Sequence, residues 1–270
     1  MLIIGMQIAK RKHQRSEKRG KRAASGTSAD TWLYGVHPVL AALANPARTI
    51  GRFLITAEAH QRLASDLPAG GPTPRIVERG ELDRALPAGA VHQGVAVEAQ
   101  PLPAADLEVL VSGLDPKARA LVVVLDQITD PQNAGAVLRA AAAFGAAALV
   151  TTDRHAPPTS GAFAKAAAGA LEAVPLIRVG NLVSALETLQ SHGFWSLGLD
   201  GRAEHNIADA DTGRRIALVL GAEGVGLRRL TRERCDMLAR IPIASTVESL
   251  NVATAAAIAL YEVTRQAARD

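Results

Sequence analysis

The stretch that decides the fold reads Ile216-Ala217-Leu218-Val219-Leu220-Gly221-Ala222-Glu223-Gly224-Val225-Gly226-Leu227. Its five leading apolar residues predict a strand buried on both faces, as in a parallel sheet covered by helices. The glycines that follow allow backbone to approach a ligand closely. Because open α/β sheets bind ligands at the carboxyl ends of their strands, the stretch predicts a ligand site at that edge.

Similar apolar runs on either side of this stretch complete an α/β pattern. Strands are expected at 121–125, 147–151, 175–179, 195–199, 216–220 and 240–243, with helices at 133–144, 161–171, 182–191, 227–235 and 250–268. The last helix has apolar residues at helical spacing, Val252, Ala256, Ala259 and Val263. We therefore expect one parallel-sheet domain over residues 119–270.

A second, smaller α/β pattern precedes it. Strands are expected at 52–56, 75–77 and 94–98, and helices at 37–43, 58–67 and 81–86, which predicts a small domain over residues 31–100. Pro101, Pro103 and Pro116 mark residues 101–118 as a linker. Residues 1–30 are interpreted as a flexible arm.

Charge is concentrated in that arm. Residues 1–30 hold eight Lys or Arg against two acidic residues, while the whole chain carries only +4, so the rest is close to neutral. Such a run favours a polyanionic partner such as RNA, with a merely solubilising tail as the alternative. A single cysteine, Cys235, excludes an intrachain disulfide and favours a reducing compartment such as the cytosol. No apolar run reaches transmembrane length.

Two further polar segments follow predicted strands. Residues 125–135 form a polar loop that leads into a helix, with Asn133 near its start and Arg139 alone in an alanine-rich stretch. A guanidinium there can hold a phosphate or carboxylate, although a solvent-facing arginine and a capping asparagine explain the pair equally simply. Residues 241–251 carry Ser249, an ordinary N-cap candidate, and Asn251, a poor residue for a helix interior.

Together the three segments resemble the motifs of the SpoU, or TrmH, family of RNA ribose 2′-O-methyltransferases. The first is matched by Asn133 and Arg139, the second by residues 221–227, and the third by 241–243 followed by 249–251. The Gly221-Ala222-Glu223-Gly224 form resembles the branch that methylates a guanosine of large-subunit (23S-type) ribosomal RNA. Residues 34–39 and 92–94 resemble that branch's substrate-binding domain.

The resemblance implies a trefoil-knotted catalytic domain, a homodimer formed through that domain, and S-adenosyl-L-methionine as cofactor. No metal is expected, because the seven histidines include no pair at three- or four-residue spacing. The resemblance places the cofactor contacts at Gly221, Ile241 and Leu250, with Leu220, Ile243 and Asn251 as neighbours. It places catalysis on Arg139, helped by Asn133, Glu223, Ser249 and Asn251. Because arginine stays protonated, we expect Arg139 to clamp a phosphate and stabilise an oxyanion rather than act as a base.

Three other functions were weighed against this one. A transfer RNA methyltransferase of the same family and a non-catalytic RNA-binding assembly factor both remain open. A nicotinamide oxidoreductase is disfavoured because the glycine order is G-x-x-G-x-G and because no acidic residue ends the strand expected at 240–243. The exact target nucleotide is not legible in the sequence.

Overall fold

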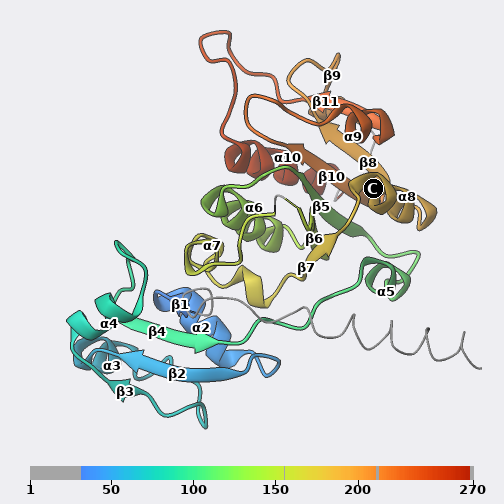
Figure 1. Ribbon diagram of the computed structural model, residues 1–270. Coiled ribbons are helices and arrows are strands. Elements are labelled where there is room, and N and C mark those ends of the chain that lie inside the picture. The colour runs from blue at the N-terminus through green and yellow to red at the C-terminus, as the bar shows by residue number, and fades with distance from the viewer. Residues whose placement is uncertain (1–31, 155, 211–212, 268–270) are drawn as a thin grey trace, which may run out of the picture.

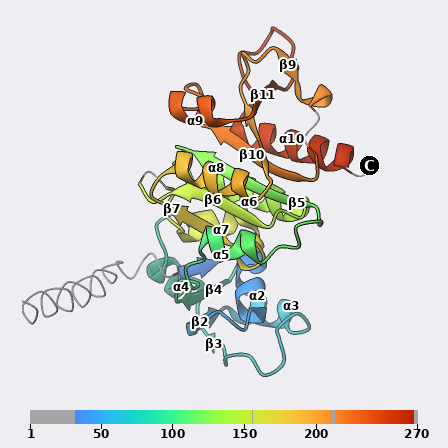
Figure 2. The ribbon, with the colours of Figure 1, turned by 90° about the vertical axis from the view of Figure 1, so that its right-hand side faces the viewer.

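Two sheets, each with its own helices, make up the protein (Figures 1 and 2). The computed structural model describes residues 32–154, 156–210 and 213–267. The predicted arm, residues 1–30, lies outside the described residues. No helix in the described part is long and apolar enough to cross a membrane.

The smaller sheet has four strands in the order β1-β4-β2-β3. β1 and β2 run antiparallel to β4, and β3 runs parallel to β2. The elements of this half are β1 (Trp32–Tyr34), α2 (Val36–Ala44), β2 (Ile50–Ile55), α3 (Ala57–Leu63), β3 (Arg75–Ile76), α4 (Arg79–Ala85) and β4 (Val95–Ala99). β1 was not predicted, because three residues are too few to show an alternating pattern.

The larger sheet has seven strands in the order β7-β6-β5-β10-β8-β11-β9, and every neighbouring pair is parallel. The strands are β5 (Ala120–Asp126), β6 (Ala148–Thr152), β7 (Leu176–Val179), β8 (Trp195–Leu199), β9 (His205–Asn206), β10 (Arg215–Gly221) and β11 (Met237–Arg240). The helices are α5 (Leu107–Ser112), α6 (Pro131–Ala143), α7 (Gly161–Ala167), α8 (Leu182–Ser191), α9 (Arg229–Arg234) and α10 (Val252–Ala267), with short 3-10 turns η2 (Ala170–Glu172) and η3 (Ile207–Asp209). The parallel sheet that the apolar runs predicted is thereby confirmed.

Alternating residues of the central strands enter different cores. Val123 and Leu125 of β5 pack with α6, α7 and α10, whereas Val122 and Val124 pack with α5 and α8. All four side chains are fully buried, which explains why the strands read as continuous apolar runs. α5 lies inside the segment predicted as a linker and buries Leu107 and Val111. The division of the chain at residues 30, 100 and 118 stays a prediction.

The end of the sheet differs from the sequence prediction. The strand expected at 240–243 lies at Met237–Arg240, because Met237 to Ala239 pair with β8 and Pro242 beyond them lacks the N–H that a ladder needs. The helix expected at 161–171 ends at Ala167, because Ala168 adopts a left-handed conformation (φ 49°) and a 3-10 turn follows.

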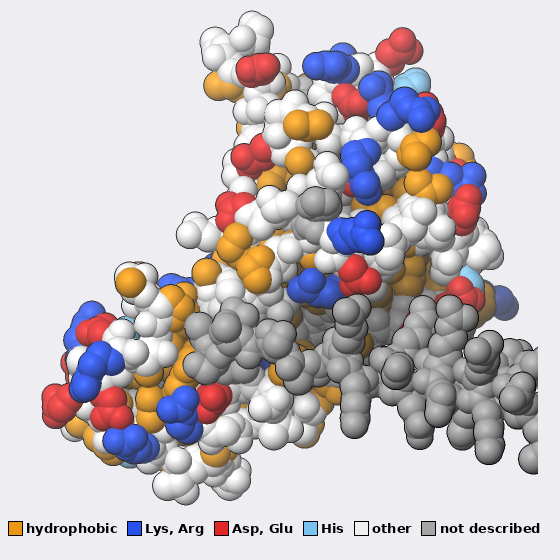
Figure 3. All heavy atoms as spheres, in the orientation of Figure 1, with side chains coloured by type: hydrophobic (Ala, Val, Ile, Leu, Met, Phe, Trp, Pro, Cys, Tyr) orange, Lys and Arg blue, Asp and Glu red, His pale blue; other side chains and the backbone are white. Residues whose placement is uncertain are grey.

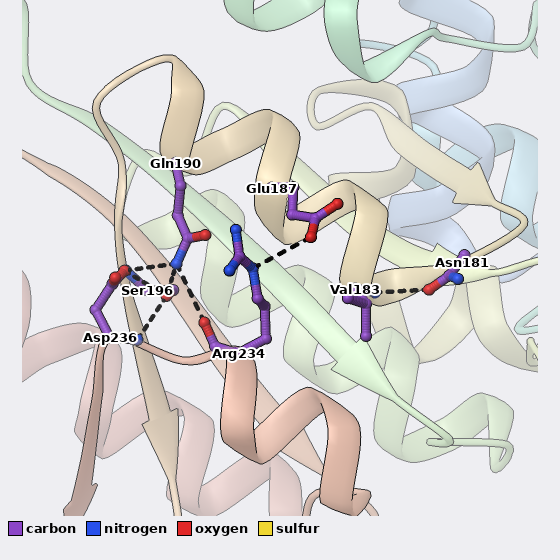
Figure 4. Close-up of polar contacts among 7 residues, drawn as sticks. All are labelled: Asn181, Val183, Glu187, Gln190, Ser196, Arg234 and Asp236. Atoms are coloured by element: carbon purple, nitrogen blue, oxygen red, sulfur yellow. Dashed lines mark hydrogen bonds and ion pairs between the residues drawn. The ribbon is translucent and has the colours of Figure 1, made fainter.

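A polar network fixes the start of β11 beside β8 and α8 (Figure 4). One carboxylate oxygen of Asp236 accepts hydrogen bonds from the Ser196 backbone N–H (2.8 Å), the Ser196 hydroxyl (2.6 Å) and the Gln190 amide (3.0 Å). Burial acts to raise the pKa of Asp236, but these hydrogen bonds outweigh it and the pKa is lowered. The network therefore fixes where β11 starts beside β8.

The two halves of the molecule meet at α7 and η2. Arg48 donates to both carboxylate oxygens of Glu172 (2.5 and 3.2 Å) and also to the Gln100 backbone carbonyl (2.7 Å). Only 4% of the Arg48 side chain and 7% of the Glu172 side chain are exposed. At the start of α7, a Cβ on Gly161 would lie 2.2 Å from the Tyr34 ring. These contacts dock the smaller half on the larger one in a fixed orientation.

Breaking the Arg48–Glu172 pair should therefore cost more than breaking an exposed pair. We predict that Glu172→Gln lowers the free energy of unfolding by about 3 kcal/mol, because it leaves a buried guanidinium without its counter-charge. Urea unfolding followed by circular dichroism measures the change. The control is Glu233→Gln, which breaks the exposed Arg229–Glu233 pair and should cost less than about 1 kcal/mol. Equal losses in the two variants would contradict the docking role.

Candidate functional site

The three predicted motifs meet at the carboxyl edge of the larger sheet. Asp126, the last residue of β5, pairs in register with Gly221, the last residue of β10. The loop into α6 and the glycine loop therefore start side by side. The segment that enters α10 completes the group, because α10 packs against both α6 and β10.

One oxygen of Glu223 joins all three motifs. Its Oε1 accepts hydrogen bonds from Nδ2 of Asn133 (3.2 Å), Nδ2 of Asn251 (2.8 Å) and the backbone N–H of Val252 (3.1 Å). Nδ2 of Asn251 also donates to Oδ1 of Asn133 (2.9 Å). These residues lie far apart in the chain, so their convergence is a property of the fold and not of local sequence.

Asn251, rather than Ser249, caps the last helix. Its Oδ1 accepts hydrogen bonds from the backbone N–H groups of Ala253 (3.0 Å) and Thr254 (3.3 Å), which are the second and third residues of α10. The N-cap prediction for Ser249 is wrong, since α10 starts at Val252. Ser249 is exposed and has no hydrogen bond within the described part of the chain. Asn251 thus serves the helix with its oxygen and Glu223 with its nitrogen.

The glycine loop closes on itself. Ala222 and Gly226 form an isolated bridge, and the Gly226 N–H donates to the Ala222 carbonyl (2.8 Å). A Cβ on Gly221 would lie 2.2 Å from the Gly226 carbonyl carbon, and Gly224 and Gly226 have positive φ angles of 75° and 74°. The loop's own turn therefore requires these glycines, in addition to any approach by a ligand.

Sequence reasoning missed the ion pair that anchors this loop. Asp126 is fully buried and accepts from the Arg228 backbone N–H (3.0 Å) and from its Nε (2.6 Å). The pair ties the exit of the glycine loop to the end of β5. A lone carboxylate at the end of an apolar strand was the available signal, because such a group is seldom buried without a partner.

The predicted cofactor residues lie at the same sheet edge. Leu220 is buried at the end of β10, while Ile241 and Leu250 are half-buried at the two ends of the loop that follows β11. Ile243 in that loop is 40% exposed, and Val225 in the glycine loop is 78% exposed. Exposed aliphatic side chains therefore stand on both loops, as a site for an organic ligand with an apolar part would need.

Arg139 is available to bind an anion. It lies on α6 six residues after Asn133, is exposed, and has no hydrogen bond or ion pair with any residue that the structure describes. Within the described ranges, no three His, Cys, Asp or Glu side chains gather in a way that could hold a metal ion. The site thus offers amides, one carboxylate and one unpaired guanidinium, which suit orientation and charge stabilisation.

Comparison with known families gives matches over most of the chain. The profile of the SpoU rRNA Methylase family matches residues 120–261, and that of the RNA 2′-O ribose methyltransferase substrate-binding family matches residues 32–105. The 23S rRNA (guanosine-2′-O-)-methyltransferase RlmB of Vibrio parahaemolyticus is 40% identical over 87% of this chain and 96% of its own length. RlmB of Escherichia coli K12 is 39% identical over 87% and 98%.

Solved structures agree with this match. The SpoU methyltransferase AviRb from Streptomyces viridochromogenes, in complex with the cofactor AdoMet, superposes with a TM-score of 0.70 at 25% identity. The superposition covers 87% of this chain and 89% of AviRb. Both halves of the chain therefore have a counterpart in that structure.

Cys235, the one cysteine of the chain, is a largely buried thiol. Its Sγ donates to the Thr231 carbonyl (3.3 Å), and burial, with the nearby Asp236 and Asp126 charges, raises its pKa to about 12.

We predict that iodoacetamide at pH 8.5 alkylates Cys235 in the native protein at least about tenfold more slowly than in urea, because little thiolate forms. Mass spectrometry of quenched time points measures both rates. Equally fast native labelling would contradict the assigned environment.

Proposed function

The chain belongs to the SpoU rRNA methylase family, and from this premise we propose that it transfers a methyl group from S-adenosyl-L-methionine to a guanosine ribose 2′-hydroxyl of large-subunit (23S-type) ribosomal RNA. The observation that carries the proposal is the convergence of Asn133, Glu223 and Asn251 at the start of α6, the helix that also bears Arg139, which is unpaired among the described residues. The near-complete coverage of RlmB relatives supports the ribosomal substrate.

The residues present fit the cofactor. The apolar side chains of Val225 and Ile243 suit the adenine and methylthio parts, and the ends of β10 and β11 offer backbone groups at Gly221 and Ile241. Oε2 of Glu223 makes no hydrogen bond with any described residue, so an acceptor remains near a cationic ligand. When bound, this cofactor supplies a methyl group already activated on a sulfonium. Leu220 and Leu250 would back the same pocket.

Arg139 and its neighbours supply positioning and charge stabilisation. The guanidinium of Arg139 clamps the phosphate beside the target ribose and stabilises the negative charge that develops on the 2′-oxygen. The ribose oxygen bonds to the methyl carbon as the carbon–sulfur bond breaks, and the hydroxyl proton passes to a phosphate oxygen or water. Asn133 orients the ribose, while Glu223 and Asn251 hold the loops in place. Ser249, which is exposed and makes no hydrogen bond with any described residue, would bind RNA or cofactor.

We further propose a homodimer through the larger sheet's half of the molecule. α10 exposes Ile258 (40%) and Tyr261 (56%) on the side away from its buried residues, and Tyr261 packs edge-on against Phe144, the residue after α6, with ring centroids 6.3 Å apart. This apolar surface suits a second copy of the same surface. We also propose that the chain forms a trefoil knot near the site. A cytosolic location is proposed because the chain has a single cysteine.

The central test is transfer of labelled methyl groups to unmodified large-subunit ribosomal RNA, with digestion to nucleosides. We expect label in 2′-O-methylguanosine. Label appearing only in transfer RNA would keep the chemistry and overturn the ribosomal substrate. Absence of transfer to either RNA, with or without cofactor binding, would favour a non-catalytic RNA-binding role.

Arg139→Ala should separate catalysis from cofactor binding. We predict that it lowers kcat at least about 100-fold, because charge on the 2′-oxygen loses its stabiliser. S-adenosylmethionine affinity, measured by calorimetry, should change less than about threefold, because Arg139 serves the RNA side of the site. Arg119→Ala, which removes an exposed arginine before β5 at the opposite sheet edge, should leave both values unchanged. Loss of cofactor affinity in Arg139→Ala would contradict the division of roles.

Tyr261→Glu tests the dimer. Sedimentation equilibrium should show a dimer for the unchanged protein and a monomer for this variant, because a charge would be buried at the interface. Leu230→Glu, at a residue equally exposed on α9, should remain dimeric. A monomer at micromolar concentration in the unchanged protein would overturn the dimer proposal.

A further inference from the structure

Two cations from different halves of the molecule hold the same loop. Lys165 of α7 donates from its Nζ to the Val91 carbonyl, and Arg62 donates from its terminal nitrogen to the Gln93 carbonyl (3.0 Å). Neither forms an ion pair with a carboxylate among the described residues. We call Arg62, Val91, Gln93 and Lys165 the seam cluster.

The loop that these cations hold is strained. Gln93 has a φ of 56°, in the left-handed region that a non-glycine residue seldom adopts. Its Oε1 accepts a hydrogen bond from the Val36 N–H (3.1 Å), and a Cβ on Gly35 would lie 3.1 Å from that oxygen and 3.3 Å from Nζ of Lys165. Such strain tends to be kept at ligand-binding sites. Val91, with 63% of its surface exposed, leaves the loop open to a partner.

The positive charge of Lys165 is not balanced by a carboxylate among the described residues. Partial burial lowers its pKa, and a neutral carbonyl is its only recorded partner in the described structure. An anion arriving at Nζ would restore favourable electrostatics. On the face that Figure 3 shows, Lys and Arg side chains stand among Asp and Glu and do not form one basic patch. Attraction of a polyanion there must come from particular cations.

The seam cluster lies next to α6, the helix that carries Asn133 and Arg139. A Cβ on Gly135 of α6 would lie 2.5 Å from the Phe163 carbonyl and 2.8 Å from the Ala166 Cβ, both on α7. Gly135 is two residues after Asn133 and one turn before Arg139, and Lys165 is the neighbour of Ala166. One helix crossing therefore separates Lys165 from the candidate catalytic residues.

We propose that Lys165 and Arg62 bind the phosphate backbone of the substrate RNA where it leaves the target nucleotide and passes onto the smaller half. The proposal rests on the proposed function. The guanidinium of Arg62 and the ammonium of Lys165 each contact a phosphate, and the exposed Val91 contacts the sugar edge. Their hydrogen bonds to the loop carbonyls keep the two cations in position. The seam cluster thus positions RNA and takes no part in the chemistry.

The test compares Lys165→Gln and Arg62→Gln with the unchanged protein in methyl transfer at several salt concentrations. We expect each variant to raise KM for RNA roughly tenfold at low salt, while kcat and KM for S-adenosylmethionine stay within about twofold. The slope of log KM against log salt should fall by about 0.7 to 0.9 in each, because one phosphate contact is lost. A purely structural role would leave that slope unchanged.

Two controls keep the result readable. Lys165→Arg keeps the charge and should retain the salt slope, and Lys117→Gln removes an exposed lysine before β5 at the far edge of the sheet and should change nothing. Unchanged KM for RNA in an active Lys165→Gln protein, or a higher KM with an unchanged slope, would overturn the seam proposal alone. If the unchanged protein methylates no RNA, the proposed function fails first, and binding of the same RNA measured by fluorescence anisotropy decides the seam separately.

Discussion

The site depends on a single acceptor, Oε1 of Glu223. Three donors converge on this oxygen from α6, from the start of α10 and from the residue before it. Hydrogen bonds to a carboxylate are stronger than those between neutral groups, so this one group holds together segments 28 and 90 residues away in sequence. The pair between buried Asp126 and half-exposed Arg228 does the same for the other end of the glycine loop.

Much of this arrangement could be predicted, because it follows from pattern. Continuous apolar runs predict the parallel sheet, and polar segments after three strands predict a site at its carboxyl edge. Prediction from sequence failed where one side chain makes hydrogen bonds to two different segments. Asn251 caps α10 with its oxygen and contacts Glu223 with its nitrogen, and Ser249 looked like the better cap only because local rules consider one contact at a time.

Contacts between the two halves left no trace in local sequence. Gly161 is small because the Tyr34 ring lies over it, and Lys165 looks like any helix lysine until Val91 is placed beside it. The strand at Met237–Arg240 was displaced by three residues for a similar reason, since its register is set by β8 and by the Asp236 network. Hydrophobic periodicity indicates which residues are buried, but contacts with residues distant in the sequence determine where a strand or helix begins and ends.

The buried Arg48–Glu172 pair bears on which molecule would change shape if the protein binds RNA with both halves. Burial of this pair disfavours a hinge motion between the two halves, so under the proposed function an RNA that contacts both halves would have to adapt its own shape. The energy of that change depends on how freely the RNA strand moves. We therefore expect a flexible RNA strand to be a better substrate than the same nucleotides held in a rigid fold.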